Sequence, residues 1–515
     1  MANSRSKSIE DTYKKYTQRE HVLARPGMYI GEIKTINSPK WIIYSDEIIQ
    51  KVVSWNPGIY KIFDEIITNA SDECQRNESV KNIKVTISDT SITIFNDGSG
   101  IPIEIHKEHS IYVPELIFAN LLSSSNYDDT EKRTTGGTNG LGAKLTAIFS
   151  TKFIIETVSN GKKYIQVYKN NLEVIEKPKI TNNSGKEYTK ITFTPDFSRF
   201  GISDLSGQTR DVLIKRIYDI CAITNKGVSV YYNDKKVGVK DFEDYVSLYI
   251  GNKKQTRRVY EEQGRWNVVI SPSDEFQSIS FVNGISTEDG GSHIDHVILP
   301  IMKKITEELQ SKHKGITIKQ QYVKDSMFVF VNCIIDNPIF SSQTKDKHTT
   351  RVSEFGSKFI CSDDFIKKIL KLGFVDSLLA IAEAKERKSL KKTDGKKTTR
   401  VIIPKLDDAN KAGTSESERC TIILTEGDSA KTTAISGLSV VGRDYYGVFP
   451  LRGKLLNTRT ATFSQISANQ EIIYLKQILG LQIGEKYKTK TGLRYGKILI
   501  MTDQDTDGFH IKSLL

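Results

Sequence analysis

The sequence lacks the features of a secreted, membrane-spanning or fibrous protein. It contains no run of about 18 apolar residues, the length needed to cross a bilayer, and its start, MANSRSKSIEDTYKKY, has no apolar signal core. Only 12 of the 515 residues are proline, and 38% are hydrophobic and 26% charged, which disfavours long disordered tracts and repeats. These absences predict an intracellular globular protein with no membrane contact.

Cysteine is also scarce. The five cysteines lie far apart and never in C-x-x-C spacing, so neither a zinc site nor a disulfide framework is expected. A reducing compartment fits this usage best. The cysteines are Cys74, Cys221, Cys333, Cys361 and Cys420.

The excess of positive charge is modest. Lysine and arginine exceed aspartate and glutamate by 74 − 62 = 12, which permits a polyanionic partner without requiring one. Half of this excess lies between Lys385 and Arg400, where eight basic residues face two acidic ones. The segment fits either a solvated linker or a contact with a polyanion. The length predicts roughly three domains.

The first group of candidate functional residues begins on a predicted helix. From Ile59 to Arg76, apolar residues recur at helical spacing, and Glu65, Asn69 and Asp72 fall on the opposite face. Two alternating runs then predict a β-hairpin that leads into the glycine turn Asn96–Gly100. Glu65 can act as a general base, and the side-chain oxygen of Asn69, one helical turn away, can coordinate Mg²⁺.

A glycine-rich loop follows. Pro114–Ser125 has a helical pattern, and the polar stretch 127–142 then leads into the helical stretch AKLTAIF. Backbone N–H groups near Leu141 and the charge of Lys144 suit a phosphate ligand. A Walker A loop is excluded, because Gly142 is not followed by Lys and Ser or Thr.

The second group of candidate residues lies near the end of the sequence. The stretches CTIILT (420–425) and KILIMT (497–502) are predicted buried strands, and both end in carboxylates. If the strands are parallel, Glu426, Asp503 and Asp505 meet at one sheet edge and can bind Mg²⁺ and a phosphodiester. A calcium EF-hand is excluded, because Leu514 stands where the loop from Asp503 needs Glu.

The order E-x-x-x-N, N-x-G-x-G and glycine loop resembles the ATP site shared by DNA gyrase, Hsp90-type chaperones, histidine kinases and MutL-type proteins. In most of that superfamily the first residue of the N-x-G-x-G motif is Asp, which accepts a hydrogen bond from the adenine amino group. Asn96 stands at this position, and its amide oxygen can also accept that hydrogen bond. The turns TEGDSA and DQDTDG resemble the metal-binding domain that topoisomerases share with bacterial primases. Together these motifs make the chain similar to the first half of a type IIA DNA topoisomerase of the eukaryotic or large-virus kind.

The resemblance implies a multidomain α/β and α+β fold. It consists of a GHKL-type ATPase sandwich with an N-terminal strap (1–245), a ribosomal S5-like transducer domain (246–384), a basic linker (385–417) and an incomplete Rossmann-like TOPRIM domain (418–515). The diagnostic stretches include KIFDEIITNASDE, TGGTNGLGAKLTAIFST, NPIFSSQTK and VVGRDYYGVFPLRGK.

The resemblance also implies roles for individual residues. Glu65 is the expected catalytic base. The expected nucleotide ligands are Asn69, Asn96, Ser124, Ser125, Asn126, Gly140, Leu141, Gly142, Ala143, Lys144, Gln343, Thr344 and Lys345. The expected metal ligands are Glu426, Asp503 and Asp505, with Asn69 at the ATP site. The expected DNA contacts are Lys312, Lys314, Arg452 and Lys454, which would bind phosphates without sequence readout.

The sequence departs from the family pattern at Thr138, where relatives carry Arg, and at Thr506 and Phe509 of DTDGFH, where they read DHDGSH. The tyrosine that cleaves DNA in this family is expected to lie outside the chain.

The resemblance implies an ATP- and Mg²⁺-dependent homodimer that acts on double-stranded DNA, in the nucleus or at a viral replication site. Two alternatives stay open. One is a separate ATPase subunit that assembles with a second, cleaving chain. The other is an ATP-operated clamp of the chaperone or MutL class.

Overall fold

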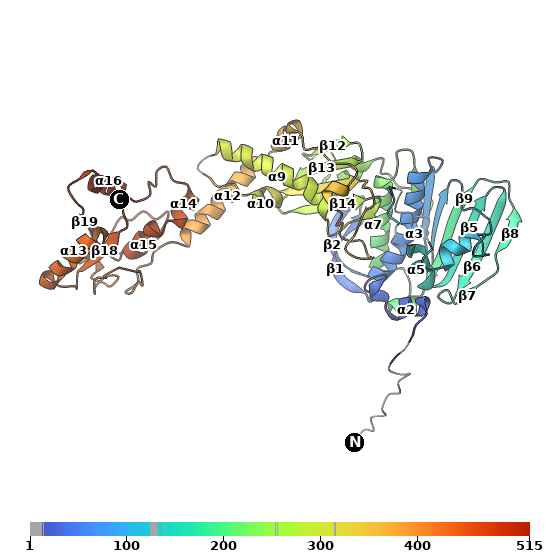
Figure 1. The fold of residues 1–515 in the computed structure, drawn as a ribbon, viewed down its shortest axis with the longest axis horizontal. Coiled ribbons are helices and arrows are strands. Elements are labelled where there is room, and N and C mark those ends of the chain that lie inside the picture. Colours follow the sequence, from blue (N-terminus) through green and yellow to red (C-terminus); the bar gives the residue numbers. More distant parts are fainter. Residues whose placement is uncertain are drawn as a thin grey trace, which may run out of the picture. The chain divides into compact units, whose positions relative to one another are not determined.

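The computed structural model describes the chain except residues 1–12, 14, 124–131, 138–139, 253, 255 and 314–315 and the side chain of Glu386. The chain forms two compact units, each with its own sheets and helices (Figure 1). The first unit comprises Met1–Ile301 and Met327–Leu372, and the second comprises Met302–Ser326 and Gly373–Leu515. No described helix is both long and apolar enough to cross a membrane.

A nine-stranded, mainly antiparallel sheet dominates the first unit. The hairpin predicted from the alternating pattern is present, because β3 (Asn82–Ile87) pairs antiparallel with β4 (Ile92–Asp97) and alternate side chains of both strands are buried. The spatial order is β11 (Lys235–Lys236), β10 (Ser229–Tyr232), β3, β4, β9 (Tyr188–Pro195), β5 (Ser150–Ser159), β6 (Lys162–Lys169) and β7 (Val174–Ile175), with β8 (Lys179–Asn182) also paired to β6.

Three helices pack against this sheet: α3 (Pro57–Arg76), α5 (Gly142–Ile148) and α7 (Gln208–Ile223) (Figure 1). Helix α3 begins where the Asn56 side chain accepts a hydrogen bond from a free backbone N–H group. Its predicted apolar stripe lies in the core. The remaining helices around the sheet are α2 (Gln18–Ala24), η1 (Pro26–Met28), α4 (Val113–Ala119), α6 (Phe197–Phe200) and α8 (Phe242–Ile250).

Helix α4 is shorter than the sequence predicted. It ends at Ala119 because Asn120 has an extended backbone and Leu122 has a left-handed one, with φ of 59°. The Ser123 hydroxyl group donates to the carbonyl groups of Leu116 and Asn120, which stabilises this non-helical ending.

A hairpin and a five-stranded sheet complete the first unit. The hairpin pairs β1 (Ile36–Tyr44) with β2 (Glu47–Trp55). In the sheet, β14 and β16 are parallel neighbours, and the chain between them includes the long helix α9 (Ser292–Lys312). The spatial order is β12 (Val259–Gln263), β13 (Trp266–Pro272), β16 (Met327–Cys333), β14 (Gln277–Val282) and β15 (Ile285–Ser286), and η2 (Val352–Glu354) and α11 (Asp363–Leu370) follow in sequence.

The second unit contains a three-stranded parallel sheet in the order β18 (Tyr446–Leu451), β17 (Thr421–Glu426) and β19 (Lys497–Met501). The sequence analysis foresaw β17 and β19 but missed β18. Its expectation of burial is right for β17 and wrong for β19, which is mostly exposed because it is an edge strand with one neighbour.

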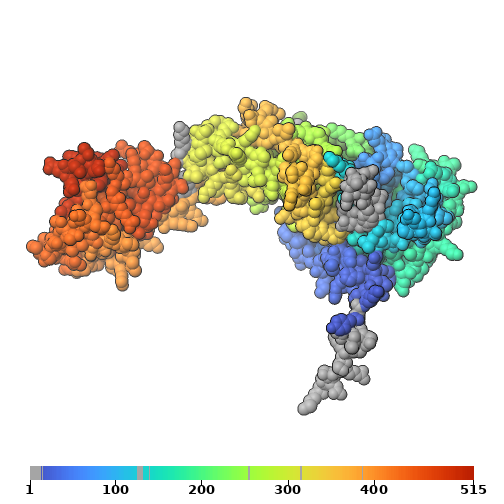
Figure 2. Space-filling view, viewed as in Figure 1, coloured from blue at the N-terminus to red at the C-terminus, as the bar shows by residue number. Residues whose placement is uncertain are grey.

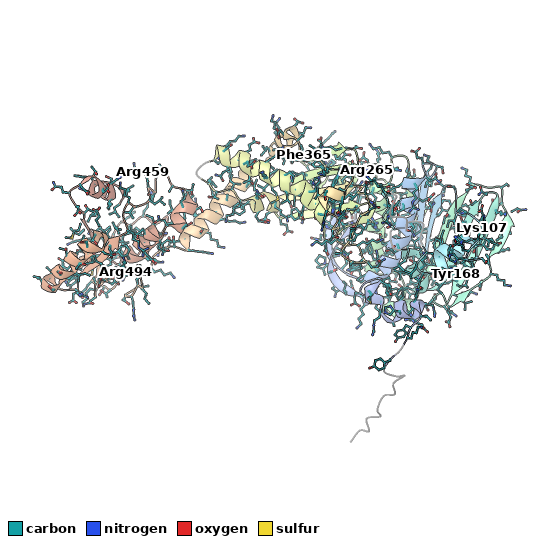
Figure 3. All side chains as sticks on the ribbon, viewed as in Figure 1. Lys107, Tyr168, Arg265, Phe365, Arg459 and Arg494 are labelled. Carbon is teal, nitrogen blue, oxygen red and sulfur yellow. The ribbon has the colours of Figure 1, made fainter. Side chains whose placement is uncertain are left out.

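Helix α13 (Gly427–Val441) packs against β17 and β18 of this sheet, and the residues from β17 onward are drawn in orange and red in Figure 2. The other helices of the second unit are α10 (Gln320–Asp325), α12 (Phe374–Lys391), η3 (Ser417–Arg419), α14 (Phe463–Ala468), α15 (Gln470–Leu479) and α16 (Thr506–Leu514). Arg494, labelled in Figure 3, is fully buried, and it pairs with Asp408 and donates to the carbonyl groups of Thr398 and Ile478. The basic segment begins on α12 and continues into the loop after it.

Candidate functional site

The polar stripe of α3 is mostly buried. Glu65 is 6% exposed and Asp72 is 2% exposed, whereas Asn69 faces solvent. The sequence pattern suggests a solvated helix face, but two segments distant in sequence cover it. They are the described part of the glycine loop and the loop that carries Lys345.

Two lysines hold the carboxylate of Glu65. The Nζ atom of Lys61 lies 2.7 Å from Glu65 Oε1, and Nζ of Lys345 lies 3.9 Å from the same oxygen. Burial alone raises the pKa of Glu65, but Lys345 and Lys61 outweigh it, so this pKa lies below its ordinary value. Glu65 is therefore ionised at neutral pH.

Lys345 links its own loop to Glu65 of α3 and to the glycine loop. It is buried, its backbone adopts a left-handed conformation with φ of 65°, and its Nζ atom donates to the carbonyl oxygen of Gly136 at 3.3 Å. The preceding residue, Thr344, accepts a hydrogen bond from Nζ of Lys61 at 3.3 Å through its carbonyl oxygen. This loop therefore contacts both the lysine–glutamate pair and the glycine loop.

Helix α5 begins directly against Glu65. A Cβ atom added at Gly142 would lie 1.9 Å from Glu65 Oε2, so no residue with a side chain fits there without moving the carboxylate. Close approach of backbone to a charged group explains the glycine at this position.

Asp72 anchors the glycine loop. Its two carboxylate oxygens accept hydrogen bonds from the backbone N–H groups of Gly136 and Gly137, at 3.2 and 3.1 Å. Burial raises the pKa of Asp72 to about 6, and the two N–H groups only partly oppose this effect. The sequence analysis placed Asp72 on the polar face but gave it no role.

Lys144 is a buried cation on α5. It is 3% exposed, and its Nζ atom donates to the carbonyl oxygen of Ser123. Burial lowers its pKa to about 8. No ion pair with a carboxylate is found for Lys144 among the described residues. A buried ammonium group of this kind suits an anionic ligand.

Asn96 ends the hairpin and precedes the glycine turn. It is 7% exposed and lies on β4 opposite Ile83 and Thr189. The turn after it needs glycine at Gly100, where φ is 66° and an added Cβ atom would lie 2.1 Å from the carbonyl oxygen of Val158. The turn therefore lies tightly against β5.

The structure thus brings Gly142 at the start of α5 and Lys345 against Glu65 in the middle of α3, whereas Lys144 of α5 contacts Ser123. Gly140, Leu141 and Ala143 precede or begin α5, and Gln343 and Thr344 precede Lys345. Several predicted residues lie outside the described part of the chain: Ser124, Ser125, Asn126, Thr138 and Lys314. Lys61 was not among the predicted site residues, although its i,i+4 spacing to Glu65 is a visible signal for an ion pair on a helix.

The second group of candidate residues lies at the ends of the parallel strands. Glu426 ends β17 and stands just before α13 without a capping side-chain hydrogen bond, and its Oε2 atom accepts a hydrogen bond from the backbone N–H of Asp503 at 3.3 Å. Asp505 caps α16, where its side chain accepts from Gly508 N–H at 2.8 Å. Asp503 and Asp505 are exposed, and the three side chains do not form a closed cluster of ligand atoms among the described residues.

Three predicted DNA-contacting residues, Lys312, Arg452 and Lys454, are exposed. Lys454, which follows β18, pairs with Asp507 of the acidic turn at 2.9 Å, so these two segments of the second unit are adjacent. Arg452 lies 4.0 Å from Glu471. Lys312 ends α9 and pairs with Glu308 at 2.8 Å.

Comparisons with known proteins agree with this arrangement. Residues 56–199 match the family of histidine kinase-, DNA gyrase B- and HSP90-like ATPases, residues 232–398 match DNA gyrase B, and residues 421–515 match the Toprim domain. The crystal structure of the ATPase region of Saccharomyces cerevisiae topoisomerase II is 44% identical, with a TM-score of 0.69, and the match covers 73% of this chain and 100% of that one.

The chain belongs to the type IIA DNA topoisomerases. A second topoisomerase structure, the ATPase and transducer domains from Balamuthia mandrillaris, is 38% identical with a TM-score of 0.71, over 74% of this chain and 100% of that one. These matches confirm the predicted fold: a GHKL-type ATPase sandwich, a transducer domain and a Toprim domain. The exact domain boundaries stay predictions.

Full-length relatives extend beyond this topoisomerase chain. DNA topoisomerase 2 of Arabidopsis thaliana is 49% identical over 99% of this chain, and that of Saccharomyces cerevisiae is 47% identical over 99%. The chain spans 35% and 37% of their respective lengths.

Proposed function

We propose that this chain is the ATP-hydrolysing and Mg²⁺-binding part of an ATP-dependent type II DNA topoisomerase, which passes one DNA duplex through another. The observation that carries the proposal is the contact of Lys345 with both Glu65 and Gly136, since it joins a distant loop to the buried carboxylate and the glycine loop. The relatives named DNA topoisomerase 2 support it along nearly the whole chain.

The first site fits ATP. Lys144 offers a buried positive charge to a phosphate. Gly142 has no side chain and so lets the start of α5 lie close to the Glu65 carboxylate. The amide oxygen of Asn96 would accept a hydrogen bond from the adenine amino group, and the loop Gln343–Lys345 would reach the terminal phosphate. Ser124–Asn126 and Gly140–Ala143 would complete the set of nucleotide contacts.

Glu65 would act as the general base in ATP hydrolysis. Its lowered pKa keeps it ionised, so it can orient the attacking water and accept its proton. Lys345 lies beside it and can stabilise the negative charge that accumulates on the terminal phosphate. The amide oxygen of Asn69, one turn along α3 and exposed, suits Mg²⁺ at the phosphates.

The acidic turns of the second unit fit a second Mg²⁺ site. Oxygen-only side chains at the carboxyl ends of neighbouring parallel strands are the donors that Mg²⁺ prefers, and Glu426, Asp503 and Asp505 provide them. When bound, the ion would polarise a DNA phosphate. Lys454, beside the acidic turn, and Arg452 would bind the DNA backbone, as would Lys312 and Lys314.

The whole enzyme would be a homodimer that binds double-stranded DNA and acts in the nucleus or at a viral replication site. The match to a Toprim domain argues against a chaperone- or MutL-type clamp. An enzyme whose cleaving domain is a second chain is the remaining alternative. Pull-down of a cleaving chain from the source cell would support that alternative, and a single longer polypeptide would exclude it.

The variant Glu65→Gln tests the catalytic assignment. We expect it to lower the rate of ATP hydrolysis by about 10² to 10⁴ and to leave ATP binding nearly unchanged. Glu73→Gln, on the same helix but half-buried and accepting a hydrogen bond from the Asn77 side chain, is the matched control and should hydrolyse ATP normally. Lys144→Ala should instead weaken binding. Near-normal turnover by Glu65→Gln would overturn the assignment.

DNA stimulation tests the topoisomerase assignment separately. Duplex DNA should stimulate ATP hydrolysis, most strongly at low salt, because phosphate contacts release counterions. Charge reversal at Arg452 and Lys454 should reduce the stimulation and leave basal hydrolysis unchanged. A clamp of the chaperone class would show no such dependence.

A further inference from the structure

A small turn outside both sites brings together three side chains that can bind a metal ion. The turn lies between β4 and α4 and is fixed by its backbone. His106 N–H donates to the carbonyl oxygen of Ile111 and Ser110 N–H to that of His106, both at 2.8 Å, and Ile105 and Tyr112 form an antiparallel bridge. The Tyr112 ring also packs edge-on against Tyr164 of β6, with ring centroids 5.7 Å apart.

The side chains of this turn converge. One nitrogen of His106, one nitrogen of His109 and one carboxylate oxygen of Glu108 all lie within 4.8 Å of one another. The two imidazole rings are stacked, with centroids 4.8 Å apart and planes at 24°. Lys107, labelled in Figure 3, lies inside the turn but contributes no ligand.

His106 provides a second, independent observation. Its Nδ1 atom is shielded from water and has no hydrogen-bond partner among the described residues. A shielded polar atom without a partner is unusual, because its burial costs free energy unless a hydrogen-bonding group or a metal ion binds to that atom. Within the described residues this is also the only cluster of three such ligands, and the acidic turns of the second unit do not form one.

We propose that His106, Glu108 and His109 bind a divalent transition-metal ion of the zinc type. Two imidazoles and one carboxylate suit Zn²⁺, Co²⁺ or Ni²⁺ rather than Mg²⁺, which prefers oxygen ligands alone. Glu108 and His109 are exposed, so water can complete the coordination shell. The backbone hydrogen bonds of the turn hold these three residues close together.

The bound ion would stiffen the segment that leads into α4. That helix is followed by Ser123, whose carbonyl oxygen accepts the hydrogen bond from Lys144. The site itself, however, does not depend on the function proposed above, because binding is measured without ATP or DNA.

The test is a titration of the chain with Co²⁺, followed by its visible absorption, in buffer that contains excess Mg²⁺ to occupy the oxygen-only sites. We expect one equivalent of Co²⁺ to bind and to show the visible d–d bands of an ion held by nitrogen and oxygen ligands. Zn²⁺ should displace the bound Co²⁺. His109→Asn and Glu108→Gln should each weaken binding by about tenfold or more. His313→Asn makes the same chemical change outside the cluster and should bind like the wild type.

Both substituted side chains are exposed, so thermal unfolding without metal should be unchanged in these variants. Saturating Zn²⁺ should raise the unfolding temperature of the wild type more than that of His109→Asn, because an ion that binds only the folded state stabilises it. The proposal is overturned if no equivalent binds in excess Mg²⁺. It is equally overturned if His109→Asn and Glu108→Gln bind Co²⁺ as tightly as His313→Asn does.

Discussion

The two acidic sites of this topoisomerase chain have opposite surroundings. In the first unit, Glu65 is buried between two lysines and against the start of α5. In the second unit, Asp503 and Asp505 are exposed and project from turns after an edge strand. Both sites use carboxylates, but only the first one encloses its carboxylate within the protein.

The difference shows two ways in which a protein can hold a carboxylate. Around Glu65 the low dielectric strengthens charge interactions, so the protein itself sets the ionisation and position of this side chain. The acidic turns leave their carboxylates hydrated, so in the function proposed above a cation and a DNA phosphate would complete the site. We therefore expect substitutions to have large effects in the first unit and small ones in the second.

The largest effect on stability is expected at Arg216, whose guanidinium is fully buried beside Asp64 of α3. Its Nε atom lies 2.6 Å from Asp64, and it donates to the carbonyl oxygen of Gly284 at 2.7 Å. Arg216→Met should lower the free energy of unfolding by about 3–5 kcal/mol, because the buried carboxylate of Asp64 loses its guanidinium partner and keeps only the more distant Lys61 as an ion-pair partner, at 3.9 Å. Urea unfolding measures this.

Arg210→Met, on the same helix, is the control for Arg216. Its ion pair with Asp89 is partly exposed, so the loss should be below about 1 kcal/mol. The double variant Arg216→Met with Asp64→Leu should recover much of the lost stability. Equal losses for the two arginine variants would break the contrast between buried and exposed charges.

The second prediction concerns the pH dependence that Asp72 causes. Its pKa in the folded chain, about 6, exceeds the ordinary value of 3.8. The stabilising contribution of this difference is therefore fully present below about pH 4 and is lost as the pH rises through about 6. It amounts to about 2–3 kcal/mol. The free energy of unfolding of the wild type minus that of Asp72→Asn should fall accordingly between pH 4 and 7.

The same two proteins provide the check on that prediction. Urea unfolding at several pH values isolates Asp72, because all other titrating groups are common to both. A difference that stays constant with pH would show that Asp72 is not a buried carboxyl with a raised pKa.

The third prediction compares two glycines, one in each unit. Gly142→Ala places a methyl group on the Glu65 carboxylate, so it should destabilise the first unit by about 1–3 kcal/mol and reduce ATP hydrolysis. Gly437→Ala lies within α13, where an added Cβ atom meets nothing within 4 Å, and should stabilise its helix by about 0.5–1 kcal/mol. Loss of stability in both variants would contradict the contrast.

The smallest effect is expected at Asp428, which follows Glu426 in the acidic turn region. It pairs with Lys405, and both side chains are exposed. Asp428→Asn should leave the thermal unfolding temperature of the chain unchanged within measurement, because water and salt screen such a pair. A large shift would mean that the second unit also depends on its surface charges.

Local patterns predicted much of the framework. The helical spacing of Ile59–Arg76 predicted α3, because one apolar face has to pack on a core. The alternation before Asn96 predicted the hairpin β3–β4, and the buried run before Glu426 predicted β17. The pattern failed where burial depends on distant neighbours, as at the exposed edge strand β19 and at the early end of α4.

Spacing and residue type were enough to select Glu65, Asn69 and Lys144 as candidates for the proposed chemistry. The burial of Glu65, its pairing with Lys61 and Lys345 and the anchoring of the glycine loop by Asp72 became visible only in the folded chain. Helix and strand periodicities arise from contacts within a few residues, so they are visible in a window of sequence. Ionisation and burial arise from segments that meet only when the chain folds, and no local pattern records which segments those will be.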